Sequence, residues 1–163
     1  MAEISELKPK RRERFFRYAP LLLWIGVIFL VSTTLGAMSN TSRFIRPILV
    51  FLFPNAPEET LIVYHTYIRK AAHFTEYAIL AFLAARAFSG SSIKLQQKFW
   101  FVFAFVLVLF IALIDEMNQS FNTARTGSIT DVLLDCCGGL TMIVLYYVYR
   151  CRKEREANQD FCR

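Results

Sequence analysis

The sequence predicts an all-α membrane protein, a four-helix transmembrane bundle with both termini in the cytoplasm. Hydrophobic residues make up 55% of its 163 residues, more apolar surface than a soluble domain of this size can bury. They gather in long runs that are separated by charged stretches, which is the pattern of membrane-spanning helices. Aromatic residues stand at the ends of several runs, where Trp and Tyr anchor a span at the membrane interface. We therefore expect one domain, residues 1–163, with short polar cytoplasmic tails.

Four apolar runs approach the roughly 20 residues that a helix needs to cross a ~30 Å hydrocarbon core. They are residues 18–35, 70–88, 99–115 and 131–149. The first carries no charge, the second has ionisable groups in its first two turns, and the fourth ends in tyrosines followed by Arg150. A further apolar stretch, residues 44–53, is too short to cross and contains Pro47. We expect this stretch to lie in the membrane interface between the first two spans or to re-enter the membrane from one side.

The distribution of basic residues predicts the orientation. Fourteen of the 19 Lys and Arg residues lie in the N-terminal tail, the connection between the second and third spans, and the C-terminal tail. Cytoplasmic flanks carry this excess, so we predict that these three segments are cytoplasmic. The remaining basic residues fall on the outer side: Arg43, Arg46, Arg69, Lys70 and Arg125. The net charge of +6 then reflects topology, and without a recognition motif we expect no nucleic-acid partner.

Ionisable residues stand at the ends of three spans, and these ends meet at the outer face if the chain reverses direction at each span. Charges near hydrocarbon are costly, so they usually face a bundle interior, a cavity or a partner. We therefore predict a polar pocket at the outer face. Its candidate members are Lys70, His73, Glu76, Tyr77, Asp115, Glu116, Gln119, Arg125 and Asp131.

In the second span, Lys70, His73 and Tyr77 share one helix face, because they are spaced at i, i+3 and i+7. Glu76 lies close to that face and about 9 Å below Lys70 along the axis, which is deep for a carboxylate without a partner. Two interpretations remain open. The residues form an acid/base or anion-binding set that faces a ligand, or they only tie helices together.

The third span ends in two acids, Asp115 and Glu116, although the dipole at a helix C-terminus repels negative charge. Gln119 would stack on Asp115 at i+4 if the helix continues for one more turn. Arg125 is the only basic residue of the following loop, which makes it the expected counter-ion. Its guanidinium could instead bind a phosphate or carboxylate of a ligand.

At the start of the fourth span, the Ser-x-x-acid spacing of Ser128 and Asp131 matches a capping box. Capping could be the whole role of Asp131, or it could also bind ligand. Asp135 follows one turn deeper on the same face, where capping cannot explain it. Gly138 and Gly139 permit close helix approach.

The sequence contains no nucleophile elbow, HExxH, P-loop or kinase motif, so it points to no specific reaction. The candidates for acid/base chemistry are His73, Glu76, Asp115 and Glu116. The two histidines and the acids fit no metal-ligand spacing, and we expect neither a metal nor another cofactor.

Two segments resemble the VanZ-like family of small bacterial membrane proteins: RKAAHFTEYAILAFL from Arg69, and IDEMNQSFNTARTGSITDVLLDCCGG from Ile114. The resemblance covers roughly residues 25–149. It implies a multi-pass protein of the bacterial cytoplasmic membrane. The family takes its name from a protein associated with teicoplanin resistance, which implies an envelope role linked to glycopeptide antibiotics. No settled activity comes with the resemblance, and family patterns often have Asn where this chain has Asp135.

Three functions are compatible with the sequence. The first is binding of an anionic ligand at the outer leaflet, a lipid-linked cell-wall intermediate or a phospholipid head group, with Lys70 and Arg125 holding the anion. The second is a non-catalytic membrane subunit whose buried charges serve helix packing and partner contact. The third, a small transporter, is disfavoured because four spans leave little room and no internal repeat is present.

Overall fold

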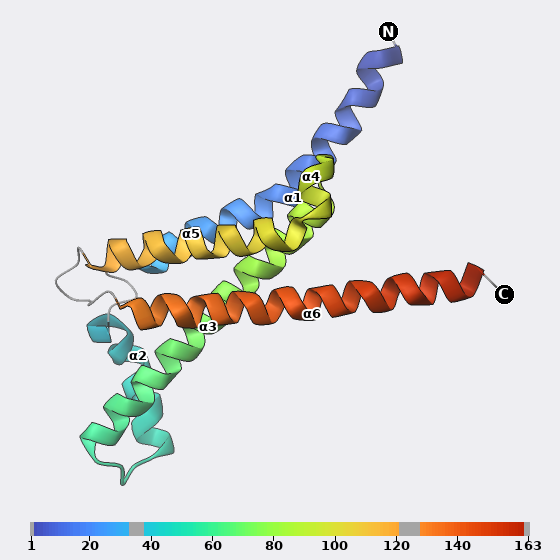
Figure 1. Ribbon diagram of the computed structural model, residues 1–163. Coiled ribbons are helices and arrows are strands. Elements are labelled where there is room, and N and C mark those ends of the chain that lie inside the picture. The colour runs from blue at the N-terminus through green and yellow to red at the C-terminus, as the bar shows by residue number, and fades with distance from the viewer. Residues whose placement is uncertain (1, 33–37, 121–127, 162–163) are drawn as a thin grey trace.

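The computed structural model describes residues 2–32, 38–120 and 128–161, and these form helices without a strand (Figure 1). The all-α prediction is confirmed for these residues. The helices are α1 (Ala2–Ser32), α2 (Met38–Leu52), α3 (Glu58–Ser89), α4 (Lys94–Lys98), α5 (Trp100–Ser120) and α6 (Ile129–Phe161).

Three of the described helices are long and apolar enough to cross a membrane. They are α1 over Arg14–Ser32, α5 over its whole length, and α6 over Ile129–Glu156. The expected second span, residues 70–88, lies within α3, which is not among the three. The physical reason is its charge, because Lys70, Glu76 and Arg86 all fall inside that stretch.

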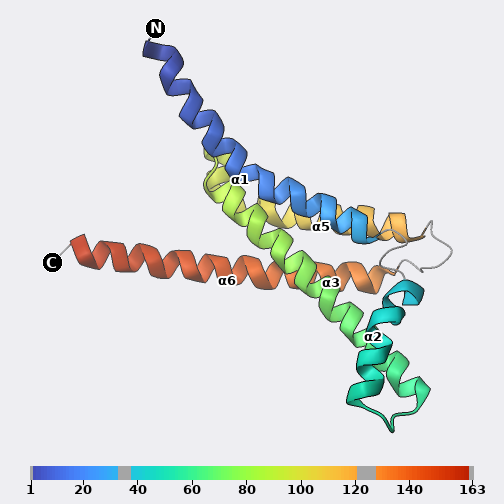
Figure 2. The same ribbon diagram turned by 180° about the vertical axis from the view of Figure 1, so that it is seen from behind.

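The long helices alternate in direction. α1 and α5 run one way and lie side by side, whereas α3 and α6 run the opposite way (Figures 1 and 2). α3 crosses the others obliquely and contacts α1, α2, α4, α5 and α6, so it is the central helix of the fold.

Small residues let α3, α5 and α6 approach closely. Ala81, Ala84 and Ala85 of α3 are fully buried. A Cβ added at Gly138 of α6 would collide with the backbone carbonyl of Phe74, and one added at Gly139 would lie 2.7 Å from a methyl group of Val108. The expected packing role of the two glycines is confirmed.

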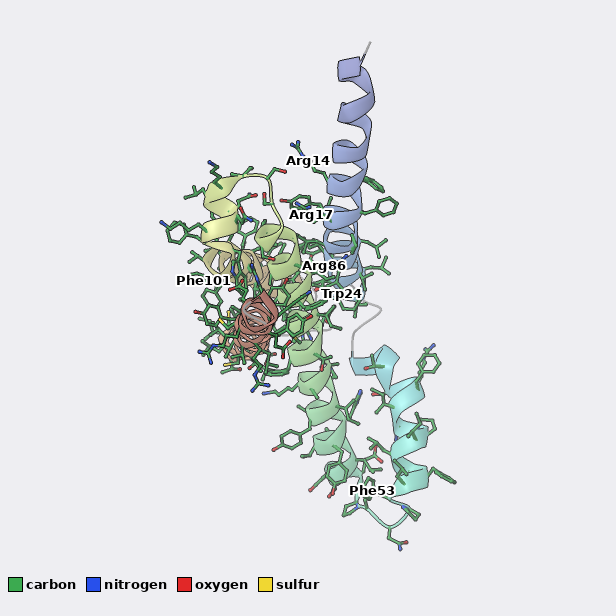
Figure 3. The ribbon with its side chains drawn as sticks, turned by 90° about the vertical axis from the view of Figure 1, so that its right-hand side faces the viewer. Arg14, Arg17, Trp24, Phe53, Arg86 and Phe101 are labelled. Atoms are coloured by element: carbon green, nitrogen blue, oxygen red, sulfur yellow. The ribbon has the colours of Figure 1, made fainter. Side chains whose placement is uncertain are left out.

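α2 and the first half of α3 form a hairpin that projects sideways from the other helices. Phe53 marks its tip, far from α6, which Figure 3 shows nearly end-on. α2 contains Pro47 and packs against α3 through the buried Leu49. The stretch expected at the interface is therefore mostly helical, and its opposite face exposes a row of large apolar side chains: Phe44, Ile48, Phe51 and Leu52.

Candidate functional site

The ends of four helices meet beside the middle of α3. These are the C-terminal ends of α1 and α5 and the N-terminal ends of α2 and α6 (Figures 1 and 2). Ionisable side chains are buried there, with Tyr77 and Asp135 fully enclosed and Asp115 only 1% exposed. The structure thus brings polar residues from three separate helices into one region.

Asp135 of α6 lies at the centre of this region and was not among the predicted site residues. His73 of α3 is its neighbour, with Nδ1 3.7 Å from Oδ1 of Asp135. Neither carboxylate oxygen of Asp135 accepts a hydrogen bond from a described residue. The sequence signal was its position one helical turn below Asp131, on the same face.

Lys70 and Asp131 form a second pair between α3 and α6, with Nζ 3.9 Å from Oδ1. The Lys70 side chain is 49% exposed and that of Asp131 is 31% exposed, so this pair lies at the rim of the site. The contact is long and solvated, and it adds little to stability.

The two acids at the end of α5 are compensated by hydrogen bonds. Nε2 of Gln119 donates to Oδ2 of Asp115 at 2.8 Å, which confirms the expected i, i+4 contact. The backbone N–H of Ser128 donates to Oε2 of Glu116 at 2.7 Å. Glu116 therefore lies at the N-terminus of α6, where the helix dipole favours a negative charge.

The capping box at the start of α6 is only half formed. Oγ of Ser128 accepts the N–H of Thr130 at 3.3 Å, so Ser128 is the N-cap. The reciprocal bond predicted for Asp131 is absent from the described contacts, because Glu116 already accepts the Ser128 N–H and Asp131 faces Lys70. Capping is therefore not the role of Asp131.

Arg125 falls within residues 121–127, outside the described residues. Its expected pairing with Asp115 or Glu116, and its expected contact with a ligand, stay predictions.

A small cavity of about 90 Å³ opens between α1, α2, α3 and α5. It is lined by Ile28, Val31, Ser32, Thr41, Arg69, Ala72, His73, Glu76 and Asp115. Trp24 links α1 to α3 next to the cavity, because its indole N–H donates to the backbone carbonyl of Glu76 at 3.0 Å (Figure 3 labels Trp24).

The cation of the cavity is Arg69, whereas the adjacent Lys70 does not line it. Arg69 makes no ion pair with any described residue. Sequence reasoning placed Arg69 outside the membrane and did not include it in the site. The available signal was its spacing, because Arg69, His73 and Glu76 stand at i, i+4 and i+7 and share a helix face.

A second polar contact joins α2 to α3 next to the cavity. The ring of His65 is hydrogen-bonded to Thr41 Oγ1 at 3.1 Å and to Ser42 Oγ at 3.3 Å. Burial, with a smaller contribution from the charge of Arg69, lowers the pKa of His65 below its usual 6.5. Thr41 also lines the cavity, so His65 helps to fix one of its walls.

Among the described helices, no group of three His, Cys, Asp or Glu residues has the geometry to hold a metal ion. The arrangement offers instead one arginine, one histidine and two carboxylates around a space that opens beside apolar side chains of α1. Such a site can hold a small polar group and exchange protons with it.

The three apolar helices and the buried polar site define the class, a multi-pass membrane protein with ionisable residues between its helices. The family model described as VanZ/LLP1 matches residues 16–150, and the chain belongs to that family. The resemblance of the two segments is thereby confirmed. No curated protein and no solved structure matches the chain.

Proposed function

We propose that this protein binds an anionic ligand at the outer face of the bacterial cytoplasmic membrane. The ligand is a phospholipid head group or a lipid-linked cell-wall intermediate, and its binding underlies a role in the envelope and in resistance to glycopeptide antibiotics. The observation that carries the proposal is Arg69, a cation that lines a cavity without an ion-pair partner among the described residues.

Access from the lipid supports this function. Ile28 and Val31 of α1 form one wall of the cavity, and Val31 is 43% exposed in the isolated chain. In a bilayer this surface of α1 faces hydrocarbon, so a lipid can present its head group to Arg69 while its chains stay beside α1.

The proposed topology has four crossings, with α3 as the oblique second one and both termini in the cytoplasm. The alternating directions of α1, α3, α5 and α6 support it (Figure 1). The hairpin of α2 and the first half of α3 then lies along the outer interface, where the row of Phe44, Ile48, Phe51 and Leu52 enters the lipid.

Within the site, His73, Glu76, Asp115 and Glu116 are the groups we propose to set protonation. Lys70, Tyr77, Gln119, Arg125 and Asp131 remain proposed contributors to ligand binding. In this proposal Arg69 takes the central place in the cavity, and Lys70 stands at the rim with Asp131.

Binding is tested with purified protein in detergent and short-chain phosphatidylglycerol as the anionic probe. Arg69→Gln should weaken binding about tenfold or more, because a phosphate loses a charge-assisted contact. Arg43→Gln is the matched control, since Arg43 is exposed on α2 and does not line the cavity. Equal affinity of wild type and Arg69→Gln would exclude this site.

A structural subunit is the second candidate function, and the pairs Lys70–Asp131 and His73–Asp135 favour it because both join α3 to α6. The two functions differ in what Lys70→Met and Arg125→Met do. A packing role predicts a loss of protein from the membrane, because the acids that pair with these cations lose their counter-charges. A ligand role predicts normal abundance with loss of resistance to a glycopeptide. Activity that falls only in proportion to abundance would favour the structural subunit.

A further inference from the structure

The cavity beside Arg69 is lined by two basic and two acidic side chains. Arg69 and His73 face Glu76 and Asp115 across it. Asp135, which is buried next to His73, adds a further carboxylate behind this wall. Arg69 attracts the negative charge of a ligand, whereas the nearby carboxylates weaken that attraction. A ligand that carries a cationic group beside its negative charge would therefore bind more tightly than one that is only negative.

The buried carboxylate of Asp115 is a second feature that indicates a ligand. It is 99% buried, because only 1% of its surface is exposed, and it lines the cavity. Gln119 occupies its Oδ2 atom at 2.8 Å, whereas Oδ1 accepts no hydrogen bond from a described residue. The hydroxyl of Tyr77 interacts with Asp115 but does not reach hydrogen-bonding geometry with Oδ1. A buried carboxylate oxygen that accepts no hydrogen bond is unfavourable, and a donor group on a ligand would satisfy it.

The positions of the charges and the volume of the cavity limit the size of a ligand group that fits there. Arg69 and Glu76 are two helical turns apart on one face of α3, about 10 Å along the axis. A single water needs about 10–15 Å³ of such a cavity. The 90 Å³ available therefore holds a small polar group of several heavy atoms but not a sugar chain.

We propose that the cavity binds a zwitterion, a phosphate ester that carries a primary ammonium group. Arg69 holds the phosphate, and Asp115 together with Glu76 receives the ammonium. The apolar wall of Ile28 and Val31 indicates that this group is the head group of an aminophospholipid such as phosphatidylethanolamine. The inference rests on the proposed function and names the ligand class of the same site.

The test compares three probes with the purified full-length protein in detergent. They are short-chain phosphatidylethanolamine, short-chain phosphatidylglycerol, and free phosphoethanolamine. The dissociation constant for the ethanolamine lipid should be about tenfold lower than for the glycerol lipid, as expected from charge-assisted contacts to the ammonium. If free phosphoethanolamine binds more weakly than the ethanolamine lipid, the ligand is a lipid. If the two bind equally, the ligand is a soluble phosphate ester with the same ammonium group.

Two variants assign the ammonium contact. Asp115→Asn should raise the dissociation constant for the ethanolamine lipid to the level of the glycerol lipid, and it should leave the latter unchanged or lower. The amide oxygen of Asn can still accept from Gln119, and Glu76→Gln serves as the second variant if Asp115→Asn fails to fold. Glu59→Gln is the matched control, an exposed acid in the first turn of α3.

The outcomes separate this inference from the function on which it rests. Equal affinity of the wild type for the two lipids overturns the zwitterion and leaves the anion-binding function intact. Unchanged discrimination in both Asp115→Asn and Glu76→Gln also overturns the zwitterion. Failure of the wild type to bind any of the three probes overturns both proposals.

Discussion

At the scale of single residues, the two acids at the end of α5 are each held by a short hydrogen bond from a described residue. The described contacts of Asp115 and Glu116 include an amide side chain and a backbone N–H at distances below 3 Å. The contacts between basic and acidic side chains of α3 and α6 are longer, at 3.9 Å for Lys70–Asp131 and 3.7 Å for His73–Asp135. These hydrogen bonds hold the two carboxylates in fixed orientations.

Glu116 offers a direct test of these hydrogen bonds. Glu116→Ala should destabilise the protein by about 1–2 kcal/mol, because the Ser128 N–H loses its acceptor at the start of α6. Glu116→Gln should cost less, since its amide oxygen can accept the same bond. Thermal unfolding in detergent measures both. An equal loss for the two variants would show that charge, and not the hydrogen bond, is what matters there.

His65 predicts a pH dependence for the hairpin. Burial lowers its pKa in the folded protein, with Arg69 adding to the effect, so the unfolded chain binds more protons as the pH falls below about 6.5. Stability therefore decreases in that range and is fully present above it. His65→Gln keeps hydrogen-bonding groups for Thr41 and Ser42 but does not titrate. The midpoint of thermal unfolding should fall further between pH 7.5 and pH 5.5 in wild type than in His65→Gln, and parallel curves would contradict the assignment.

At the scale of elements, the helices of the bundle could be predicted but the hairpin could not. Apolar runs and their length are enough to place α1, α5 and α6. Residues 58–69 extend α3 well before the expected span, although β-branched residues such as Ile62 and Val63 favour helix only weakly. Contacts with α2 stabilise this half of α3, including the hydrogen bonds of His65, and no local pattern encodes such contacts.

The same limit explains which part of the site could be predicted. Lys70, His73 and Tyr77 share a face, and periodicity identified them. Periodicity could not tell whether the cavity lies on that face or on the one that begins at Arg69, because adjacent residues point only about 100° apart on a helix. The packing of α6 on α3 determines which face lines the cavity. α6 packs on the face of α3 that carries Lys70, and Arg69 therefore lines the cavity.

The close approach of α3 and α6 gives a sharp prediction. Gly138→Ala should destabilise the protein by about 1–3 kcal/mol, because its Cβ would collide with the Phe74 carbonyl of the neighbouring backbone. Gly26→Ala is the matched control, since a Cβ there meets nothing within 4 Å and alanine favours helix by up to about 1 kcal/mol. Thermal unfolding and membrane abundance measure both, and a Gly138→Ala protein as stable as wild type would contradict the packing.

At the scale of the whole molecule, α3 decides the topology. The apolar helices α1, α5 and α6 are candidate spans by length and composition, whereas α3 carries charges along its length. If α3 crosses, the cavity faces outward and the basic tails share the cytoplasm. If α3 does not cross, α5 begins outside and α6 ends outside. The basic residues of the C-terminal tail would then lie outside, which violates the positive-inside rule.

Thiol labelling distinguishes these two topologies. We expect four crossings, because α3 runs antiparallel to α1 and α5, and because 14 of the 19 basic residues then lie inside. In spheroplasts, a membrane-impermeant maleimide should label Asn55→Cys, in the turn between α2 and α3, and should not label Cys151 or Cys162. Detergent is the control, since it should make Cys162 reactive in the same sample. Labelling of Cys162 in intact spheroplasts would mean three crossings, and the proposed outward-facing site would lose the topology on which it depends.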